Sequence, residues 1–279
     1  MPELPEVEIV RRTLSPLLGQ RMMAVSVSGP DVIRGLSAEA FAAQLVGRQV
    51  DSLERRGKYL LIGLTPKATV LVHLRMTGRL RLADATAPLE RHTHVRIALE
   101  SGGELRYTDQ RRFGGFWVVG EGTVPDGFRT LGPEPLSGDL AAGHVHQKLS
   151  RRSGPIKAAL LDQRLIAGIG NIYADESLFR ARLHPATPAH TLSEADVGRL
   201  LTAVRQTLAS AIDHHGTTIS DFLDGRGEPG LNAQQLKVYG RQGLSCEGCG
   251  GVIEKIRIAG RGTHYCPSCQ QPPRIRKVR

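Results

Sequence analysis

Residues 246–269 read CEGCGGVIEKIRIAGRGTHYCPSC, and this stretch decides more about the fold than any other part of the chain. Its four cysteines, Cys246, Cys249, Cys266 and Cys269, are spaced C-x2-C-x16-C-x2-C and are all the cysteines of the chain. This spacing is typical of a zinc ribbon. Four thiolates favour tetrahedral Zn²⁺ and leave no open position for catalysis. The sequence therefore predicts one structural zinc ion, since four unrelated buried cysteines rarely show this spacing.

Between the two cysteine pairs, the apolar alternation predicts a β-hairpin with strands at 252–258 and 263–266. The sequence AGRG separates these strands, so Arg261 is expected at the tip of the hairpin. An arginine at a hairpin tip is usually solvated. In a basic zinc finger it also suits phosphate binding, and both interpretations remain open at this point.

The composition points to a polyanionic partner. The chain has 279 residues, enough for about two domains, and 37 basic against 27 acidic residues, a formal net charge of +10. Nucleic acid is the first candidate, and an uncommitted basic surface is the alternative. No apolar run is long enough to span a membrane, and the acidic N-terminus does not resemble a signal peptide. We expect a cytoplasmic protein whose cysteines do not form disulfides.

The N-terminal sequence PELPEVEIVRRTL predicts a helix over residues 3–18. Pro2 and Pro5 suit a first helical turn, where no amide donor is needed. Glu3, Glu6 and Glu8 suit the positive end of the helix dipole. On this evidence alone, the three carboxylates are ordinary charges at a helix start.

Residues 22–120 are predicted to be rich in β-strands that form a sandwich or barrel. Short apolar runs lie at 58–64 and 69–76, and the alternation over 94–109 with a Gly pair in its centre predicts a hairpin. A short helix is expected within 30–49, capped by Ser37 and with Phe41 and Leu45 on its buried face.

The Pro- and Gly-rich segment 130–143 predicts a domain linker, after which the periodicity becomes helical. A helix–turn–helix is expected around GIGN, with Asn171 as the cap of its second helix. A long helix begins after Ser193, and a polar, Gly-rich loop follows Gly216. Residues 271–279 resemble a flexible basic tail.

The N-terminus could also supply a reactive group for catalysis. Removal of Met1 before a small residue leaves Pro2 with a free amine, and unprotonated amines form Schiff bases with carbonyl carbons. An α-amine has a pKa of about 7.7–8.0 against about 10.4 for lysine, although the secondary amine of proline is intrinsically more basic. Glu3 is adjacent and could transfer protons at the attacked carbon.

Other candidate residues have ordinary interpretations. Lys58 at the start of a strand is expected to face solvent. His73 and Met76 are expected in the core. The sequence DQRRFGG could form a basic tip with Phe113 as an apolar wedge between bases. Without further evidence, a β-bulge with Phe113 in the core is the favoured prediction.

Taken together, these motifs resemble the bacterial formamidopyrimidine-DNA glycosylases, the 8-oxoguanine repair enzymes, along essentially the whole chain. The motifs that carry the resemblance, in chain order, are PELPEVE (2–8), RRGKYL (55–60), HLRMTG (73–78), DQRRFGG (109–115), LGPEPL (131–136), GIGNIYADE (168–176) and the cysteine finger with Arg261. The terminal motif and the finger are specific in combination, whereas each internal motif alone is weak.

The resemblance implies an α+β multidomain fold: an N-terminal β-sandwich with an N-terminal helix (1–132), a helical helix–two-turn–helix domain (133–236) and a C-terminal β-hairpin zinc finger with a basic tail (237–279). The partner would be double-stranded DNA that contains oxidised purines, bound in a cleft by a monomer. The damaged nucleotide would be flipped out, because a stacked base cannot be reached. No membrane partner is implied, and the protein would associate with the nucleoid through DNA.

The resemblance also implies the roles of the catalytic residues. Pro2 would attack C1′ of the damaged nucleoside and form a Schiff base, with Glu3 as proton donor and Glu6 supporting the terminus. Lys58 matches the lysine that donates a proton in β-elimination, and Arg261 matches the finger arginine linked to δ-elimination and phosphate binding.

The implied DNA contacts come from several motifs. Asn171 matches the phosphate-binding asparagine, and loop 216–230 would cover the flipped lesion. The residues that would fill the gap and probe the opposite base are Met76, Arg111 and Phe113. The further DNA contacts would be His92, Arg152 and Lys157.

Two departures and two alternatives accompany the resemblance. Gln110 stands where the family often has proline, and the basic run at 151–153 is shorter than in the family. The first alternative is an endonuclease VIII-type glycosylase for oxidised pyrimidines, which usually starts PEGPE, whereas Leu4 stands in this chain. The second is a non-catalytic zinc-finger DNA-binding protein, which gives no reason for the sequence PELPE.

Overall fold

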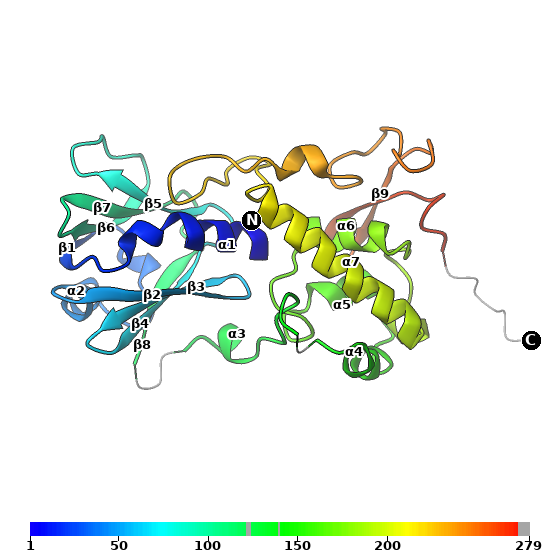
Figure 1. Ribbon diagram of the computed structural model, residues 1–279, viewed down its shortest axis with the longest axis horizontal. Helices are drawn as coiled ribbons and strands as arrows, with labels where there is room; N and C mark the ends of the chain where they lie inside the picture. The colour runs from blue at the N-terminus through cyan, green and yellow to red at the C-terminus, as the bar shows by residue number, and fades with distance from the viewer. Residues whose placement is uncertain (121–123, 139, 273–279) are drawn as a thin grey trace, which may run out of the picture. The chain divides into compact units, whose positions relative to one another are not determined.

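The computed structural model describes residues 1–120, 124–138 and 140–272, and Figure 1 labels the principal elements. The chain divides into two compact units. The first comprises Met1–Thr130 and Ile212–Ala233, and the second comprises Leu131–Ala211 and the chain from Gln234 onward. From residue 273 on, the predicted basic tail lies outside the described residues.

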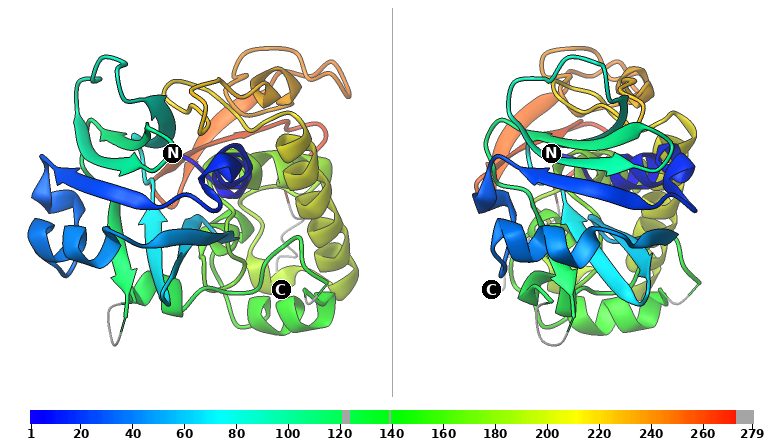
Figure 2. Two further views of the ribbon diagram at one scale, coloured as in Figure 1. Left: turned by 60° about the vertical axis from the view of Figure 1, so that its left-hand side comes forward. Right: turned by 90° about the vertical axis from the view of Figure 1, so that its left-hand side faces the viewer.

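The first unit contains two antiparallel four-stranded sheets, which face each other in Figure 2. One sheet has the order β1-β6-β7-β5 and the other β2-β3-β4-β8, so the predicted sandwich is confirmed. The predicted hairpin over 94–109 corresponds to β6 and β7. The strands are β1 (Met22–Val27), β2 (Gln49–Arg56), β3 (Tyr59–Thr65), β4 (Ala68–His73), β5 (Gly78–Asp84), β6 (Thr93–Leu99), β7 (Gly103–Asp109) and β8 (Gly115–Val119).

Aromatic and aliphatic side chains fill the space between the sheets. The rings of Tyr107 on β7 and Phe116 on β8 pack edge to face, with centroids 5.0 Å apart. Helix α2 (Ala38–Leu45) adds Phe41, whose ring lies 5.7 Å from Phe116. The Ser37 hydroxyl accepts a hydrogen bond from the Ala40 N–H, so the predicted cap is confirmed. The short helices of this unit are η2 (Pro30–Val32) and α3 (Asp126–Arg129).

Helix α1 (Leu4–Thr13) is shorter than the predicted 3–18 helix and is followed by the 3₁₀ turn η1 (Ser15–Leu17). Pro16 explains the break, because its ring has no N–H to donate and clashes with the carbonyl one turn earlier. The apolar positions predicted from the helical spacing are buried all the same: Val7, Val10, Leu14 and Leu17.

The second unit is helical. Helix α7 starts after Ser193, whose hydroxyl accepts from the Asp196 N–H, and this confirms the predicted cap. The prediction that Asn171 caps α6 is wrong, because Gly170 is the cap and Asn171 is the first helical residue. The helices are α4 (Ala142–Leu149), α5 (Ile156–Leu161), α6 (Asn171–Arg180), η3 (Ala189–Thr191), α7 (Glu194–Asp213, ending in the first unit) and η4 (Asn232–Gln235, starting there).

The hairpin of the cysteine finger pairs β9 (Glu254–Ile258) with β10 (Arg261–Tyr265). A two-residue turn joins the strands, and both Ala259 and Gly260 have positive φ angles, of 48° and 74°. Such turns match the twist of the flanking strands. Arg261 therefore stands directly after the turn, exposed as expected.

The division into units differs from the predicted domains at residues 212–233. This segment was assigned to the helical domain, but it belongs to the first unit, since its backbone donates hydrogen bonds to Glu6 and Thr13 of α1. Among the described residues, no helix is both long enough and apolar enough to cross a bilayer.

Candidate active site

The N-terminus is a buried, hydrogen-bonded structure. Pro2 is buried beside Met1, which is 42% exposed, and the side chains of Glu3 and Glu6 are almost fully buried. The Glu3 N–H donates to Glu6 Oε2 at 2.8 Å, and the Glu3 side chain accepts from the Glu6 N–H in return. This capping box satisfies two amide donors at the start of α1 and fixes the direction in which the chain enters the helix. The predicted nucleophile, Pro2, is thus attached to a helix start that the capping box holds in place.

Glu6 has a second role in this site. Its Oε1 accepts a hydrogen bond of 2.8 Å from the N–H of Thr217, which belongs to the segment 216–230. A Cβ on Gly216 would lie 3.3 Å from Glu6 Oε1, closer than ordinary contact, and Gly216 has a φ of +78°, a conformation that glycine adopts without strain. The carboxylate of Glu6 therefore joins the N-terminus to the start of the predicted lesion-covering loop.

Three further hydrogen bonds attach this loop to the first unit. The Gly225 N–H donates to Thr13 Oγ1 at 2.8 Å, and the Gly225 carbonyl accepts from the Leu82 N–H. Arg79 Nε donates to the Asp221 carbonyl at 2.7 Å. The loop is therefore hydrogen-bonded to α1 and β5, and its covering of a lesion stays a prediction.

Lys58 differs from its expected place. It lies in the two-residue turn between β2 and β3 and is only 7% exposed, so the solvent-facing interpretation is wrong. His73 is in the core, as predicted. Burial, together with the charges of Arg75 and Lys58, lowers the pKa of His73 to about 3, so this imidazole is neutral at neutral pH.

Glu8 joins α1 to the neighbouring sheet. Its carboxylate forms salt bridges with Arg11 and Arg12 of the same helix and with Arg55 of β2, at N–O distances of 2.8, 2.8 and 3.3 Å. Burial raises the pKa of Glu8, but the hydrogen bonds and charges of these arginines outweigh it and lower the pKa to about 2. Glu8 is therefore ionised and holds the helix that carries Pro2.

The residues predicted to fill the DNA gap lie on two loops of the first unit. Phe113 is 52% exposed, so its predicted core position is wrong, and the wedge interpretation fits its exposure. The Arg111 guanidinium lies 4.4 Å from the centre of the Phe113 ring, a cation–π arrangement. Met76 is half-buried in the turn between β4 and β5 instead of in the core. His92, in the turn just before β6, is also half-buried and has a φ of 67°.

In the second unit, Asn171 and the finger hairpin meet directly. The Asn171 side chain donates from Nδ2 to the Gly262 carbonyl at 3.0 Å, next to Arg261. The predicted phosphate-binding asparagine and the finger arginine are thus brought together at the amino end of α6. Helix N-termini favour anions, which adds to the suitability of this place for a phosphate.

Lys157 lies in the interior of the second unit. It was predicted to contact DNA, but its side chain is fully buried, and its ammonium is 2.7 Å from Asp175 Oδ1. It also donates to the Gly262 carbonyl and the Thr263 hydroxyl. With its ammonium so placed, Lys157 holds the hairpin that carries Arg261, and its DNA contact stays a prediction.

Arg152 is half-buried and pairs with Asp162, at an N–O distance of 2.9 Å. Arg164 shares the same carboxylate. Burial raises the pKa of Asp162, but both arginines outweigh this effect and lower it to about 2. The guanidinium of Arg152 is therefore held in a fixed orientation, and its DNA contact stays a prediction.

The four cysteines converge at one point of the finger. Their sulfur atoms lie within 4.8 Å of one another, with separations of 3.9 Å for Cys246–Cys269 and 3.5 Å for Cys249–Cys266. A tetrahedral zinc ion with Zn–S distances of about 2.3 Å separates its sulfurs by about 3.8 Å. The donor set therefore fits one structural Zn²⁺. Val238, Ile253 and the partly buried Phe179 pack around the cysteines.

Sequence reasoning missed three residues that organise these sites: Asp109, Asp175 and Thr217. Asp109 and Asp175 are almost fully buried carboxylates, and Thr217 supplies a backbone N–H. A carboxylate at a strand end or within a helix is usually exposed, so its residue type gave no signal. The two aspartates do lie inside the motifs DQRRFGG and GIGNIYADE, and this position could have marked them.

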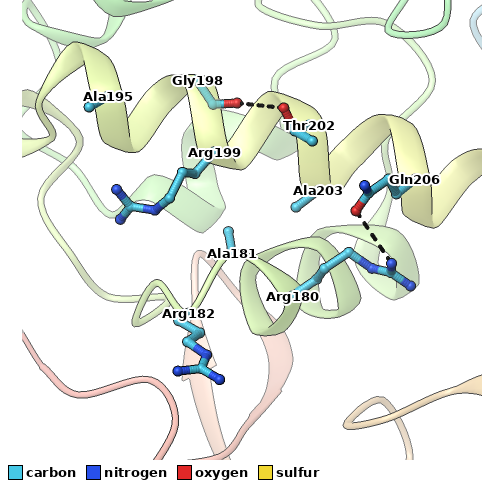
Figure 3. Close-up of a pocket in the computed structure, with 9 residues that line it drawn as sticks. All are labelled: Arg180, Ala181, Arg182, Ala195, Gly198, Arg199, Thr202, Ala203 and Gln206. Carbon is cyan, nitrogen blue, oxygen red and sulfur yellow. Dashed lines mark hydrogen bonds between the residues drawn. The ribbon is translucent and has the colours of Figure 1, made fainter.

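A surface hollow of the second unit lies apart from these residues. Figure 3 shows its lining from the end of α6 and from α7. Arg180 and Arg182 stand at the carboxyl end of α6, about 15 Å along the helix from Asn171. No residue of the candidate site lines this hollow.

Comparisons with known proteins find the same family along almost the whole chain. The model of the formamidopyrimidine-DNA glycosylase N-terminal domain matches residues 1–116, the model of its H2TH domain matches 131–223, and the model of a zinc finger found in FPG and IleRS matches 243–272. A formamidopyrimidine-DNA glycosylase of Symbiobacterium thermophilum is 49% identical over 276 residues, which cover 98% of this chain and 90% of the relative. One from Herpetosiphon aurantiacus is 44% identical, covering 97% and 100%.

Solved structures give the same result. A Lactococcus lactis FPG mutant in complex with Fapy-dG-containing DNA superposes with a TM-score of 0.91 at 37% identity, covering 97% of this chain and 100% of that one. The Lactococcus lactis Fpg complex with abasic-site DNA has a TM-score of 0.90, also at 37% identity, with coverages of 96% and 99%.

Proposed function

The chain belongs to the formamidopyrimidine-DNA glycosylase family, and from this premise we propose that it excises oxidised purines from duplex DNA and cleaves the strand at the resulting abasic site. The proposed substrates are 8-oxoguanine and formamidopyrimidines. We further propose that the protein acts in the bacterial cytoplasm, on the DNA of the nucleoid. The observation that carries the proposal is the buried terminus Pro2-Glu3, held by the capping box with Glu6.

The chemistry starts at the secondary amine that removal of Met1 exposes on Pro2. This amine attacks C1′, the glycosidic bond breaks, and the base leaves with the bonding electron pair and takes up a proton. Glu3 then donates a proton to the ring oxygen as the C1′–O4′ bond breaks, and a Schiff base (an iminium) forms at C1′. Glu3 suits this role because its carboxyl group is next to the nucleophile in the sequence and can therefore act at C1′ and at O4′.

Strand cleavage follows from the Schiff base. Loss of a C2′ proton expels the 3′ phosphate in β-elimination, and a second proton loss expels the 5′ phosphate in δ-elimination. We assign proton transfer in the first step to Lys58 and stabilisation of the second leaving phosphate to Arg261. Water finally hydrolyses the Schiff base and releases Pro2.

The remaining residues are assigned to DNA. Asn171 and Arg261 bind a phosphate at the amino end of α6, which the hydrogen bond from Asn171 to Gly262, the residue after Arg261, supports. Met76, Arg111 and Phe113 occupy the gap left by the flipped nucleotide, which the exposure of Phe113 supports. The zinc ion of the finger has a structural role, since all of its ligands come from the protein.

Borohydride trapping tests this proposal. Protein from which Met1 has been removed, verified by mass spectrometry, should form a covalent adduct with duplex DNA that carries 8-oxoguanine opposite cytosine. The adduct should be lost in Pro2→Gly and in protein that retains Met1. If processed protein gives neither adduct nor strand cleavage, the proposal fails, and an undiminished adduct with Met1 retained moves the nucleophile elsewhere.

A lesion panel decides between this activity and the pyrimidine-specific alternative. Oxidised purines should be excised faster than oxidised pyrimidines at equal enzyme concentration. The opposite order would assign the chain the substrate range of endonuclease VIII.

A further inference from the structure

Two loops of the first unit carry the residues assigned to the DNA gap, and one buried carboxylate lies between them. Met76 is on the turn between β4 and β5, and Arg111 and Phe113 are on the loop between β7 and β8. Asp109 is the last residue of β7 and is only 1% exposed.

The Asp109 carboxylate accepts hydrogen bonds from both loops. Its Oδ1 accepts from the Thr77 hydroxyl at 2.5 Å and from the Arg111 N–H at 3.2 Å. Its Oδ2 accepts from the Gly114 N–H at 2.9 Å and from the Tyr107 hydroxyl at 3.0 Å. One side chain thereby joins the residue after Met76 to both ends of the segment that carries Arg111 and Phe113.

The backbone of Asp109 extends this connection to His92, the further predicted DNA contact. Its N–H donates to the His92 carbonyl at 3.1 Å, and its carbonyl accepts from the ring of His94 at 2.9 Å. Three segments are therefore hydrogen-bonded to this single residue: the turn that contains Thr77, the loop 111–114 and residues 92–94.

The packing around the Tyr107 hydroxyl, one of the donors to Asp109, is close. A Cβ on Gly114 would lie 2.1 Å from the Tyr107 hydroxyl, and one on Gly78 would lie 2.7 Å from it. Burial and the Asp109 charge raise the pKa of Tyr107, so its hydroxyl remains a donor throughout the physiological range. Removal of an acceptor oxygen from this buried site would leave donors unsatisfied.

We propose that Asp109 is a positioning residue that holds Met76, Arg111 and Phe113 as one rigid unit and so sets the discrimination of the base opposite the lesion. This inference rests on the proposed glycosylase function. Its physical basis is that discrimination between bases requires side chains fixed to within a fraction of an ångström, whereas Schiff-base chemistry at Pro2 uses none of these loops.

Asp109→Asn is the direct test. Asparagine has one acceptor oxygen, so its NH₂ group must face either the donors on the Oδ1 side, Thr77 and Arg111, or those on the Oδ2 side, Gly114 and Tyr107. In either case one end of the segment that carries Arg111 and Phe113 is released. The ratio of kcat/KM for 8-oxoguanine opposite cytosine to that opposite adenine should fall about tenfold, equivalent to about 1.4 kcal/mol of lost discrimination. Lyase activity on a preformed abasic site in single-stranded DNA, which has no opposite base, should stay within about twofold when normalised to trappable protein.

Thr77→Val and Thr77→Ser form a matched pair that keeps the test decisive even where Asp109→Asn fails to fold. Valine removes the hydroxyl on the Met76 side and should lower the ratio, and serine should restore it. Tyr107→Phe is a comparison variant, because it removes one donor to Asp109 Oδ2 and leaves the hydrogen bonds of Thr77, Arg111 and Gly114 to Asp109 in place.

The outcomes separate the two proposals. If wild-type protein excises no 8-oxoguanine, the proposed function fails. If it excises the lesion but the ratio is unchanged in both Asp109→Asn and Thr77→Val, only the positioning role is overturned. Equal losses on the duplex and single-stranded substrates would likewise overturn it, because they indicate general destabilisation.

Discussion

The N–H of Thr217 donates a hydrogen bond of 2.8 Å to Glu6 Oε1, and the two residues are 211 positions apart in the sequence. The other carboxylate oxygen of Glu6 accepts from the Glu3 N–H next to Pro2. A single buried side chain thus connects the proposed nucleophile with the proposed lesion-covering loop.

Glu6→Gln should therefore loosen both segments. The glutamine amide must face one of the two N–H donors, which leaves a buried donor unsatisfied at a cost of about 1–3 kcal/mol. We expect faster amide hydrogen exchange in residues 216–230 and slower excision of 8-oxoguanine. Glu54→Gln, at an exposed position of β2, is the matched control. Unchanged exchange in the loop would contradict the connecting role of Glu6.

Glu8 predicts a pH dependence of stability. Its pKa is lowered to about 2 in the folded protein from an ordinary value of 4.5. A depressed carboxyl pKa adds stability above pH 4.5, and this contribution is lost as the pH falls toward 2.

Glu8→Gln should accordingly lower the free energy of unfolding by about 1–2 kcal/mol at pH 7, since its arginine partners are partly solvated. The difference between wild type and variant should shrink at pH 3, as measured by urea unfolding at both pH values. Zinc release in acid affects both proteins alike, so the difference remains the relevant quantity. A constant difference would show that the charge of Glu8 contributes nothing.

The buried pair Lys157–Asp175 should behave as a unit. Asp175→Asn leaves an ammonium buried without its counter-ion, and breaking such a pair costs about 3–5 kcal/mol. The double variant Lys157→Met with Asp175→Leu should be less destabilised than the sum of the single variants. A double-mutant cycle on the free energy of unfolding measures the coupling, and strict additivity would exclude it.

Arg261 and Lys157 should differ in the salt dependence of DNA binding. Removing one phosphate contact lowers the slope of log K against log [salt] by about 0.9. Arg261→Gln should show this change, whereas Lys157→Met should leave the slope unaltered. Arg199→Gln, in the hollow of Figure 3, is the control for loss of an exposed arginine. A reduced slope for Lys157→Met would restore its predicted phosphate contact.

Zinc removal should reduce DNA binding more than chemistry on bound substrate. The protein should contain one zinc ion per chain by elemental analysis, and chelation should increase hydrogen exchange across residues 243–272. Without its metal, the small finger has little core to keep Arg261 in place. Fluorescence anisotropy gives the affinity, and single-turnover kinetics at saturating protein gives the chemical step. A larger loss in the single-turnover rate would contradict a structural role.

Much of the fold was predictable because its signals are local. The cysteine spacing, the alternation over 94–109, the caps Ser37 and Ser193, and the apolar stripe of α1 are each contained in a single short stretch of sequence. The candidate site was partly predictable for another reason, since the motifs around Pro2, Asn171 and Arg261 carry a family resemblance.

The sequence alone determined the metal site, the helix that starts at the N-terminus, the sandwich and the candidate nucleophile. Only the tertiary structure decided that Lys58 and Lys157 are buried, that Phe113 is exposed, and that residues 216–230 belong to the N-terminal unit. The physical reason is that burial and hydrogen-bond partners depend on segments far apart in the chain. A lysine has the same local propensity whether or not an aspartate far away in the sequence forms an ion pair with it. Only the folded chain therefore distinguishes a buried lysine from an exposed one.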